Sequence, residues 1–314
     1  MIIASAPGKC ILLGEHAVVY GYPAVAVALN IRSYCSIHRI SEKYIHFNLP
    51  DQSFDIICEN LEQLLKSIPQ KYLQFPQVLV SLSKRFNFKV SNISIQIQSN
   101  LWRGAGLGSS ASTSIAFLFA IFHLYRVDKK FIPEFAFMME KYVHGTPSGI
   151  DNSVCYWGGT LVFQEKIREK FTIPKFPMLI THSGTTHNTG NIVREIKNSS
   201  SSMKKSFSEI GQIVQEGLNV LKLADLVRLG ELFNKNHDIL STMGVSTEDI
   251  EIIRTIALTN GAYGSKVTGA GGGGCVISLG ELNNLKKIKS ILHLRGYISK
   301  ISYVDYNGGR IESE

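Results

Sequence analysis

Residues 104–112 form a glycine-rich turn that runs directly into an apolar segment. The residues before the turn, 93–98, alternate apolar and polar side chains like a half-buried strand, and apolar residues recur at helical spacing over 115–122. Glycine lets the backbone approach an anion closely, and the first N–H groups of a helix point toward one. The order of strand, glycine turn and helix therefore predicts a phosphate site, although such a turn can also serve only as a connection.

The usual nucleotide-binding loop does not explain this turn. That loop ends in Gly-Lys followed by serine or threonine, whereas Gly108 is followed by Ser109 and the turn contains no lysine. If phosphates bind here, other segments of the chain must supply the positive charge.

The composition is typical of a globular, cytoplasmic protein. Of the 314 residues, 44% are hydrophobic, and the 33 Lys and Arg residues are scattered, so the net charge of +8 indicates a solvated surface rather than a nucleic-acid site. The five cysteines lie far apart and form no C-x-x-C pair, which argues against a zinc site or a disulfide framework. No stretch approaches about 18 uninterrupted apolar residues, so we expect no membrane span.

We expect an α+β fold of two domains, residues 1–170 and 171–314, because strands and helices mix without a long parallel alternation. Residues 1–50 read as a series of short strands, and residues 54–86 contain two helices separated by the region between Pro69 and Pro76. Residues 150–151 enter a strand or a short helix. The other expected helices cover 109–125, 133–142, 208–223, 225–240, 247–260 and 283–294, and the other expected strands cover 93–98, 160–163, 178–181, 274–279 and 298–304.

A first segment with chemical potential is residues 7–21, where a lysine on a strand precedes a Gly-Glu-His turn. The lysine is Lys9, and Glu15 and His16 are polar residues between apolar runs. Each has an ordinary structural explanation when taken alone, as a surface lysine or a histidine with its hydrogen bonds satisfied. The segment becomes informative only together with others.

A second segment contains two carboxylates, Glu140 near the end of the expected helix and Asp151 beyond a Pro-Ser-Gly turn. Phosphoryl transfer uses such a division, with one acid helping to hold Mg²⁺ and another beside the attacking hydroxyl. Two acids at this spacing can also be a solvated helix residue and a helix cap.

A third segment, residues 266–277, is a second glycine-rich stretch that formally matches G-x-G-x-x-G at residues 269–274. In a dinucleotide-binding fold a helix follows that motif, whereas residues 275–279 look like a strand. We therefore reject the dinucleotide-binding interpretation.

Together the three segments resemble the three signature motifs of the GHMP kinases, which are named for galactokinase, homoserine kinase, mevalonate kinase and phosphomevalonate kinase. They occur in the family's order and span nearly the whole chain, from Pro7 to Cys275. Residues 7–21 and 144–152 are most similar to the mevalonate kinases, whereas galactokinases read Gly-Glu-His-Thr-Asp in the first segment. The resemblance implies an N-terminal domain like domain 2 of ribosomal protein S5, a ferredoxin-like C-terminal domain, and a cleft between them.

The resemblance also implies roles for individual residues. Asp151 matches the family's catalytic aspartate and Lys9 the lysine paired with it, while Ser110 and Glu140 match the Mg²⁺ ligands. Glu15, His16, Thr189 and Gly271 match positions that face the substrate. The phosphates of ATP would be held by the glycine loop, namely Gly104, Ala105, Gly106, Leu107, Gly108, Ser109, Ser110, Ala111 and Ser112.

The activity implied by the resemblance is transfer of the γ-phosphoryl group of ATP to the C5 hydroxyl of mevalonate, with Mg²⁺ as cofactor. The expected partners are ATP and mevalonate, with no nucleic acid and no membrane, and the sequence leaves open a monomer and a homodimer. The alternatives are another GHMP kinase, acting on phosphomevalonate or on the C3 hydroxyl of mevalonate, and a relative that binds a ligand or RNA without turnover.

The sequence departs from the family pattern at two places. Residues 101–103, Leu-Trp-Arg, stand where relatives usually carry a proline before the glycine loop, so the approach to the loop is expected to differ in shape. Gly184 and His187 stand where many relatives carry Lys and Arg, which removes positive charge and predicts an altered hold on an acidic substrate.

Overall fold

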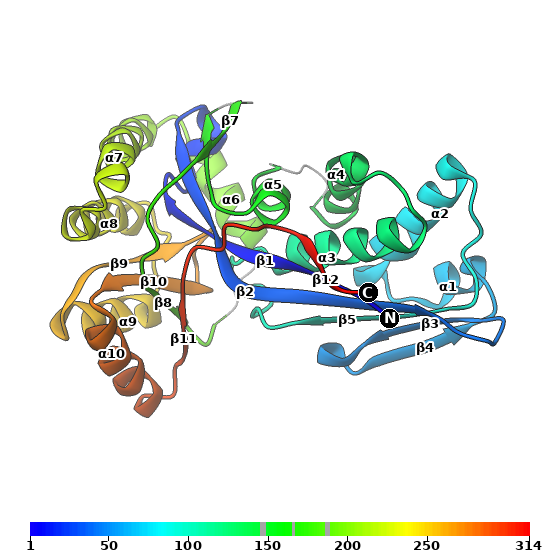
Figure 1. The fold of residues 1–314 in the computed structure, drawn as a ribbon. Helices are drawn as coiled ribbons and strands as arrows, with labels where there is room; N and C mark the ends of the chain where they lie inside the picture. The colour runs from blue at the N-terminus through cyan, green and yellow to red at the C-terminus, as the bar shows by residue number, and fades with distance from the viewer. Residues whose placement is uncertain (145–148, 165–166, 186–188) are drawn as a thin grey trace.

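Two long antiparallel strands, β1 (Ile2–Leu13) and β2 (Ala24–Arg39), run from one half of the molecule into the other in the computed structural model (Figure 1). The structure describes residues 1–144, 149–164, 167–185 and 189–314. The expectation of only short strands in residues 1–50 was wrong. Pro7 and Gly8 shift the register between β1 and β2, so they form an irregularity within one strand and do not end it.

The first half contains an eight-stranded sheet in the order β12-β1-β2-β5-β3-β4, with β6 paired to β2 and β7 to β6. Its pairs are antiparallel except for β3 and β5. The expected strands at 93–98 and 160–163 are confirmed as β5 and β6. The remaining bounds are β3 (Ile45–Leu49), β4 (Phe54–Cys58), β5 (Ile93–Ser99), β6 (Thr160–Gln164), β7 (Ile167–Phe171) and β12 (Arg310–Ser313).

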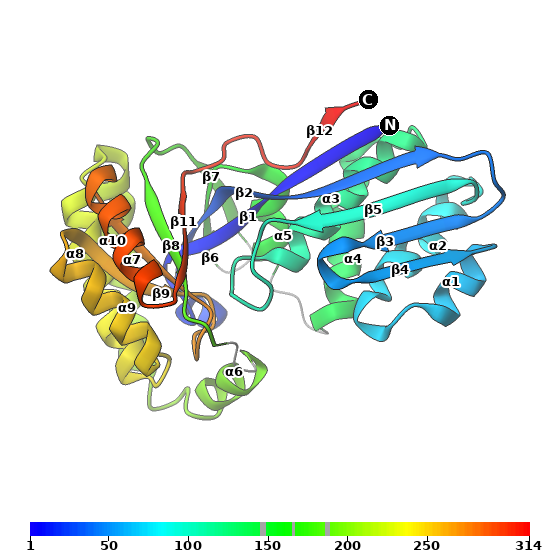
Figure 2. The same cartoon turned by 90° about the horizontal axis from the view of Figure 1, so that it is seen from below.

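Five helices lie on one face of this sheet, as Figures 1 and 2 show from two sides. They are α1 (Leu61–Ser67), α2 (Gln74–Phe86), α3 (Ser109–Leu124), α4 (Ile132–His144) and α5 (Ile150–Trp157); single turns lie at η1 (Ala17–Tyr20), η2 (Pro50–Gln52), η3 (Gln70–Tyr72) and η4 (Lys129–Phe131). The predicted helices at 109–125 and 133–142 are confirmed, and residues 150–151 begin a helix. Two helices do occur within 54–86, but Phe54–Cys58 is a strand and Pro76 lies in the first turn of α2.

The second half contains a four-stranded antiparallel sheet in the order β11-β8-β10-β9. Counted along the chain within this sheet the order is 4-1-3-2, which is that of the ferredoxin-like domain implied by the resemblance. The expected helices and strands of this half are confirmed, whereas α6 and β9 were not predicted. The bounds are β8 (Met178–His182), α6 (Thr189–Asn198), α7 (Lys204–Leu223), α8 (Leu226–Thr242), α9 (Glu248–Thr259), β9 (Ala262–Thr268), β10 (Cys275–Gly280), α10 (Leu282–Leu294) and β11 (Ile298–Ser302).

The two halves share a hydrophobic core. Alternate residues of a strand face opposite sides of a sheet, and in β10 Cys275 and Ile277 face one core while Val276 faces another. The first of these cores also contains Leu12 of β1 and Val25 of β2. β1 and β2 therefore pack against the second sheet as well as forming the centre of the first.

The end of the chain returns to its beginning. After β11 the chain crosses back, and β12 pairs with β1, with Ile3 opposite Ser313 (Figure 2). The chain changes from the first sheet to the second between β7 and β8, and the division at residues 170 and 171 stays a prediction.

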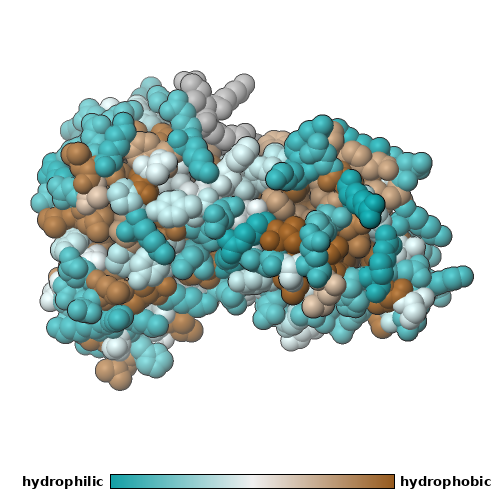
Figure 3. All heavy atoms as spheres, viewed as in Figure 1, coloured by the Kyte–Doolittle hydropathy of each residue, from teal (hydrophilic) through white to brown (hydrophobic). Residues whose placement is uncertain are grey.

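The surface is mixed in character. On the face drawn in Figure 3, apolar residues form separate patches among polar residues on both halves. Among the described residues, no helix combines the length and the apolar character needed to cross a membrane.

A buried arginine holds the returning segment in place. Arg32 of β2 forms an ion pair with Asp305 and donates hydrogen bonds to the carbonyl oxygen of Gly308 at 2.5 Å and to Oγ of Ser5 at 2.8 Å. Arg32 and Asp305 are both buried. One side chain thus connects β1, β2 and the segment that leads into β12.

We expect Arg32→Met to lower the free energy of unfolding by about 3–5 kcal/mol, because the buried carboxylate of Asp305 is left without its counter-charge. The matched control is Arg228→Met, which breaks the exposed pair with Glu216 and should cost less than about 1 kcal/mol. Urea denaturation measures both values. Equal losses in the two variants would contradict the structural role of Arg32.

Candidate active site

Lys9 of β1 and Asp151 of α5 form an ion pair, with Nζ and Oδ1 3.0 Å apart. The Lys9 side chain is 5% exposed and the Asp151 side chain 34%, so the ammonium group is enclosed while the carboxylate faces an opening. Burial acts to lower the pKa of Lys9, but the adjacent Asp151 carboxylate outweighs it, and the pKa is raised above its usual value. Lys9 is therefore a permanent positive charge at neutral pH.

Gly108 brings the start of α3 against this pair. It is the residue that precedes α3 and has a φ of 69°, a conformation that side chains disfavour. A methyl group on Gly108 would lie 2.9 Å from Cγ of Lys9, and the backbone N–H of Lys9 donates to the carbonyl of Leu107 at 2.9 Å. An anion at the N-terminus of α3 would consequently lie close to Lys9 and Asp151.

The members of the predicted phosphate loop differ in burial and in backbone conformation. The glycines at 104, 106 and 108 have positive φ angles and shape the turn. Ala105 and Leu107 are buried in the core that the halves share, and Ser112 is buried and donates to the carbonyl of Ala6 at 2.8 Å. These three side chains anchor the loop, while Ser109 and Ser110 are half-buried at the start of α3.

The second glycine stretch lies directly against the loop. Methyl groups on Gly106 and Gly274 would lie 3.1 Å from the carbonyl oxygens of Thr268 and Ala105, respectively. β10 follows the stretch as a strand, which confirms that the match to a dinucleotide motif is false. Gly271 packs against Val245, where a methyl group would lie 2.1 Å from a side-chain carbon.

A small hollow lies beside Asp151 and contains the residues that could hold a metal. Its lining consists of Ser110, Ala111, Ser114, Glu140, Asp151 and Asn152. Asn152 donates from Nδ2 to Oε2 of Glu140 at 2.6 Å and to the carbonyl of Ala136 at 2.9 Å. Its buried Oδ1 has no hydrogen-bond partner among the described residues. The predicted residues Ser110, Glu140 and Asp151 are thus brought together.

Asn152 lines the hollow, but no sequence pattern predicts a role for it. The available signal was its position directly after Asp151 within a family motif. Its contact with Glu140 depends on how α4 and α5 pack together, which a sequence pattern does not report.

Glu15 and His16 lie next to each other in very different surroundings. Glu15 exposes no surface and forms an ion pair with Lys266. His16 has a φ of 61° and donates from Nε2 to the carbonyl of Ala270 at 3.0 Å. Burial lowers the pKa of His16 to about 4, against the opposing effect of this hydrogen bond, so the imidazole is neutral at pH 7. Contact of either residue with a substrate stays a prediction.

Gly184, His187 and Thr189 follow β8 in the chain. Thr189 begins α6, but its side chain lies outside what the structure describes, as does His187 altogether. Gly184 is exposed, and a methyl group there would meet nothing within 4 Å. In the approach to the glycine loop, Trp102 packs its ring against His182 and lies under Nζ of Lys300.

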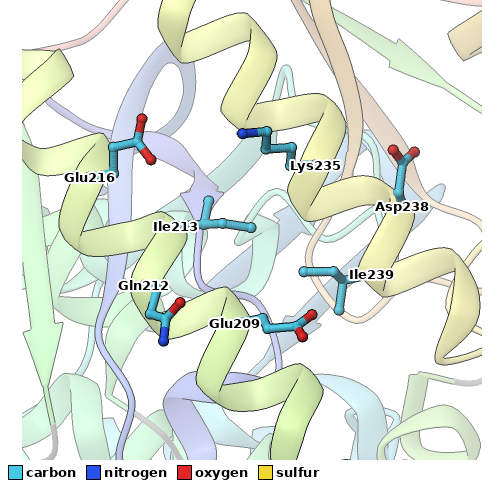
Figure 4. Close-up of a pocket in the computed structure, with 7 residues that line it drawn as sticks. All are labelled: Glu209, Gln212, Ile213, Glu216, Lys235, Asp238 and Ile239. Carbon is cyan, nitrogen blue, oxygen red and sulfur yellow. The ribbon is translucent and has the colours of Figure 1, made fainter.

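A wider hollow lies between α7 and α8 and is lined by Glu209, Gln212, Ile213, Glu216, Lys235, Asp238 and Ile239 (Figure 4). It contains none of the residues predicted from the motifs. Its polar side chains are mainly acidic, which suits neither phosphate nor a carboxylate substrate. The hollow beside Asp151 is the better candidate for the active site.

Known proteins resemble this chain over almost its whole length. Family models described as the GHMP kinases N-terminal domain and the GHMP kinases C-terminal match residues 74–159 and 218–298. The mevalonate kinase of Pyrococcus horikoshii is 31% identical over 99% of this chain and 98% of its own. The chain belongs to the mevalonate kinase family of the GHMP kinases. The mouse mevalonate kinase is 29% identical over 88% of this chain and 86% of its own.

The fold agrees as well. The crystal structure of the Methanococcus jannaschii mevalonate kinase superimposes with a TM-score of 0.88 and 28% identity, covering 96% of this chain and 98% of that one. The α+β class and the GHMP kinase architecture are confirmed. The chain is accordingly a kinase, and ATP is its phosphoryl donor.

We expect Gly108→Ala to weaken ATP binding by at least about tenfold, because the added methyl group displaces Lys9 from the start of α3. Isothermal titration calorimetry measures the affinity. Gly21→Ala is the matched control, since Gly21 also has a positive φ of 88° but has nothing within 4 Å of the added methyl group. Equal affinity in wild type and Gly108→Ala would refute this placement of the nucleotide.

The lowered pKa of His16 predicts a pH effect on stability. Between about pH 6.5 and pH 4 the unfolded chain binds a proton on His16 that the folded chain does not, so the free energy of unfolding falls as the pH is lowered through this window. His16→Gln keeps an N–H donor for the Ala270 carbonyl without the titration. Denaturant unfolding at several pH values should therefore show a shallower decline for the variant, and identical slopes would contradict the assignment.

Proposed function

We propose that this chain transfers the γ-phosphoryl group of ATP to the C5 hydroxyl of mevalonate, giving mevalonate 5-phosphate and ADP. The observation that carries the proposal is the Lys9–Asp151 pair at the N-terminus of α3, where the glycine loop offers backbone N–H groups to phosphates. The substrate is taken from relatives named mevalonate kinase that match nearly the whole chain.

Asp151 binds the hydroxyl group of the substrate that is to be phosphorylated. Its carboxylate is the more exposed member of the ion pair and lines the hollow, so a substrate hydroxyl can donate a hydrogen bond to it. A carboxylate is a weak base toward an alcohol, and the proton is therefore transferred late, after attack on phosphorus has begun. Asp151 acts first by orienting the hydroxyl and then by accepting its proton.

Lys9 stabilises the negative charge that develops during the reaction. Its ammonium group is enclosed by β1, Gly108 and Asp151, where water does not screen it. The N–H groups of the glycine loop and of the first turn of α3 supply further positive potential toward the phosphates. These groups are held in position before the substrate binds, so they need little reorganisation during the reaction.

Ser110 and Glu140 would hold Mg²⁺. The donor set fits, because Mg²⁺ binds oxygen ligands and usually takes one or two carboxylates together with substrate phosphates. Oδ1 of Asn152, which has no hydrogen-bond partner in the described part of the chain, adds an oxygen in the same hollow, and Asn152 also donates to Glu140 through Nδ2. When bound, Mg²⁺ would offset negative charge on the phosphates.

We also propose that His16, Thr189 and Gly271 face the mevalonate. His16 supports this role because it is neutral and half-buried beside the second glycine stretch, so it can contact a substrate without repelling Lys9.

A cytoplasmic location is supported by the five cysteines, all of which are buried and free. Light scattering of the purified protein would distinguish the monomer from the homodimer.

The product assay tests the substrate and the position of phosphorylation. Purified protein is incubated with ATP, Mg²⁺ and mevalonate, and NMR identifies the phosphorylated hydroxyl; parallel reactions contain phosphomevalonate. We expect mevalonate 5-phosphate. Phosphorylation at C3, or turnover of phosphomevalonate alone, would identify another GHMP kinase, and absence of turnover combined with salt-sensitive RNA binding would indicate a non-catalytic relative.

We expect Asp151→Asn to lower kcat by at least about 100-fold, because the amide cannot accept the proton, while ATP still binds. Steady-state kinetics and calorimetry give the two quantities. Asp55→Asn is a suitable control, since Asp55 is an exposed aspartate on β4 that pairs with His46. Near-normal turnover of Asp151→Asn would refute the catalytic role of Asp151.

A further inference from the structure

The ion pair between Glu15 and Lys266 is buried. It connects the first signature segment, residues 7–21, to the third, residues 266–277. Both side chains are completely enclosed. Lys266 also donates to the carbonyl of Val267 at 2.8 Å. Burial raises the pKa of Glu15 and lowers the pKa of Lys266, and the attraction between the two groups opposes both effects. Loss of either partner would leave an unpaired polar or charged group in the interior.

Glu15 lies in a turn whose backbone is held on both sides. The preceding residue, Gly14, has a φ of 101°, and a methyl group there would lie 2.5 Å from Cα of Ala24. The following residue, His16, also has a positive φ and bonds to the carbonyl of Ala270. The turn therefore has little freedom, and the carboxylate of Glu15 lies in the interior, where it pairs with Lys266.

Lys266 lies in β9, the strand that leads into the second glycine stretch. Thr268 lies two residues later. Its Oγ1 accepts a hydrogen bond from the N–H of Ile11 and donates one to the carbonyl oxygen of Ile11, each at 3.0 Å. Ile11 is two residues after Lys9 on β1. Beyond Thr268, the glycine stretch meets the phosphate loop, where a methyl group on Gly269 would lie 3.2 Å from Cα of Gly106.

We propose that Glu15 and Lys266 are a positioning pair, which sets the second glycine stretch and His16 at the correct distance from the phosphate loop and from Lys9. The pair accompanies the hydrogen bonds of Thr268 with Ile11 and of His16 with Ala270, which also connect the first segment to β9 and the glycine stretch. Glu15 then acts through the backbone and does not touch the mevalonate. This inference rests on the proposed function for its kinetic readout only.

A double-mutant cycle tests the proposal with the variants Glu15→Met, Lys266→Met and the two together. Each single variant leaves one buried charge without its partner, whereas the double variant removes both. We expect each single variant to lower the midpoint of thermal unfolding by about 6 °C or more. We expect each to lower kcat and ATP affinity by about 10- to 100-fold, because the loop and the glycine stretch move apart.

The double variant decides between positioning and substrate contact. If the pair acts by positioning, the double variant should regain at least half of the decrease in log kcat and in log ATP affinity that the single variants show. Its KM for mevalonate should lie within about twofold of wild type. The proposal is overturned if the KM for mevalonate stays high in Glu15→Met and in the double variant but is normal in Lys266→Met, because Glu15 would then contact the substrate. Recovery of thermal stability without recovery of kcat, or normal values in both single variants, would also overturn it.

Two controls complete the experiment. The same cycle on the exposed pair Glu216 and Arg228 should change the unfolding midpoint by less than about 2 °C. If a methionine variant does not fold, Glu15→Gln keeps the shape of the side chain and should show the same pattern of losses in milder form. ATP affinity does not depend on which alcohol is phosphorylated, so the pair can be tested even if wild type fails to turn over mevalonate.

Discussion

The close approach of the Gly108 backbone to the Lys9–Asp151 ion pair is the constraint on which the site depends. Three elements meet there: β1 carries Lys9, α5 carries Asp151, and α3 begins at the loop that crosses over them. A side chain at residue 108 would separate them, because a methyl group already meets Lys9 at 2.9 Å. Glycine therefore places the positive end of a helix, a fixed ammonium group and a carboxylate within one small volume.

The position of β1 in turn depends on both halves of the molecule. In the first sheet β1 pairs with β2 and β12, and its far end packs into the core shared with the second sheet. Hydrogen bonds between Ile11 and Thr268 fix the strand relative to β9. The two walls of the candidate site, the glycine loop and the second glycine stretch, are consequently held to the same strand that carries Lys9.

The sequence predicts the parts of this site that have local signatures. The glycine loop, the helix after it and the rejected dinucleotide motif follow from short patterns, and the resemblance to the GHMP kinases assigns roles to Lys9, Glu140 and Asp151. The family and the fold class are confirmed, whereas the residue roles remain proposals that the arrangement of the side chains supports.

Sequence patterns do not predict contacts between residues that are far apart in the chain. β9, Ala262–Thr268, was not predicted because Gly264, Ser265 and Lys266 interrupt any apolar alternation. Lys266 is nevertheless buried, since it pairs with Glu15, 251 positions away. The burial of Glu15 and the contact of Asn152 with Glu140 depend on packing between elements in the same way. The length of β1 was missed because a Pro-Gly pair ordinarily marks a turn, whereas here it is accommodated as an irregularity opposite β2.

A crystal structure with Mg²⁺, a non-hydrolysable ATP analogue and mevalonate is the most direct test of the central claim. We expect the terminal phosphate to lie at the N-terminus of α3 beside Lys9, with the C5 hydroxyl of mevalonate within hydrogen-bond reach of Asp151. Binding of the nucleotide away from the glycine loop, or a mevalonate whose C5 hydroxyl points away from Asp151, would contradict it.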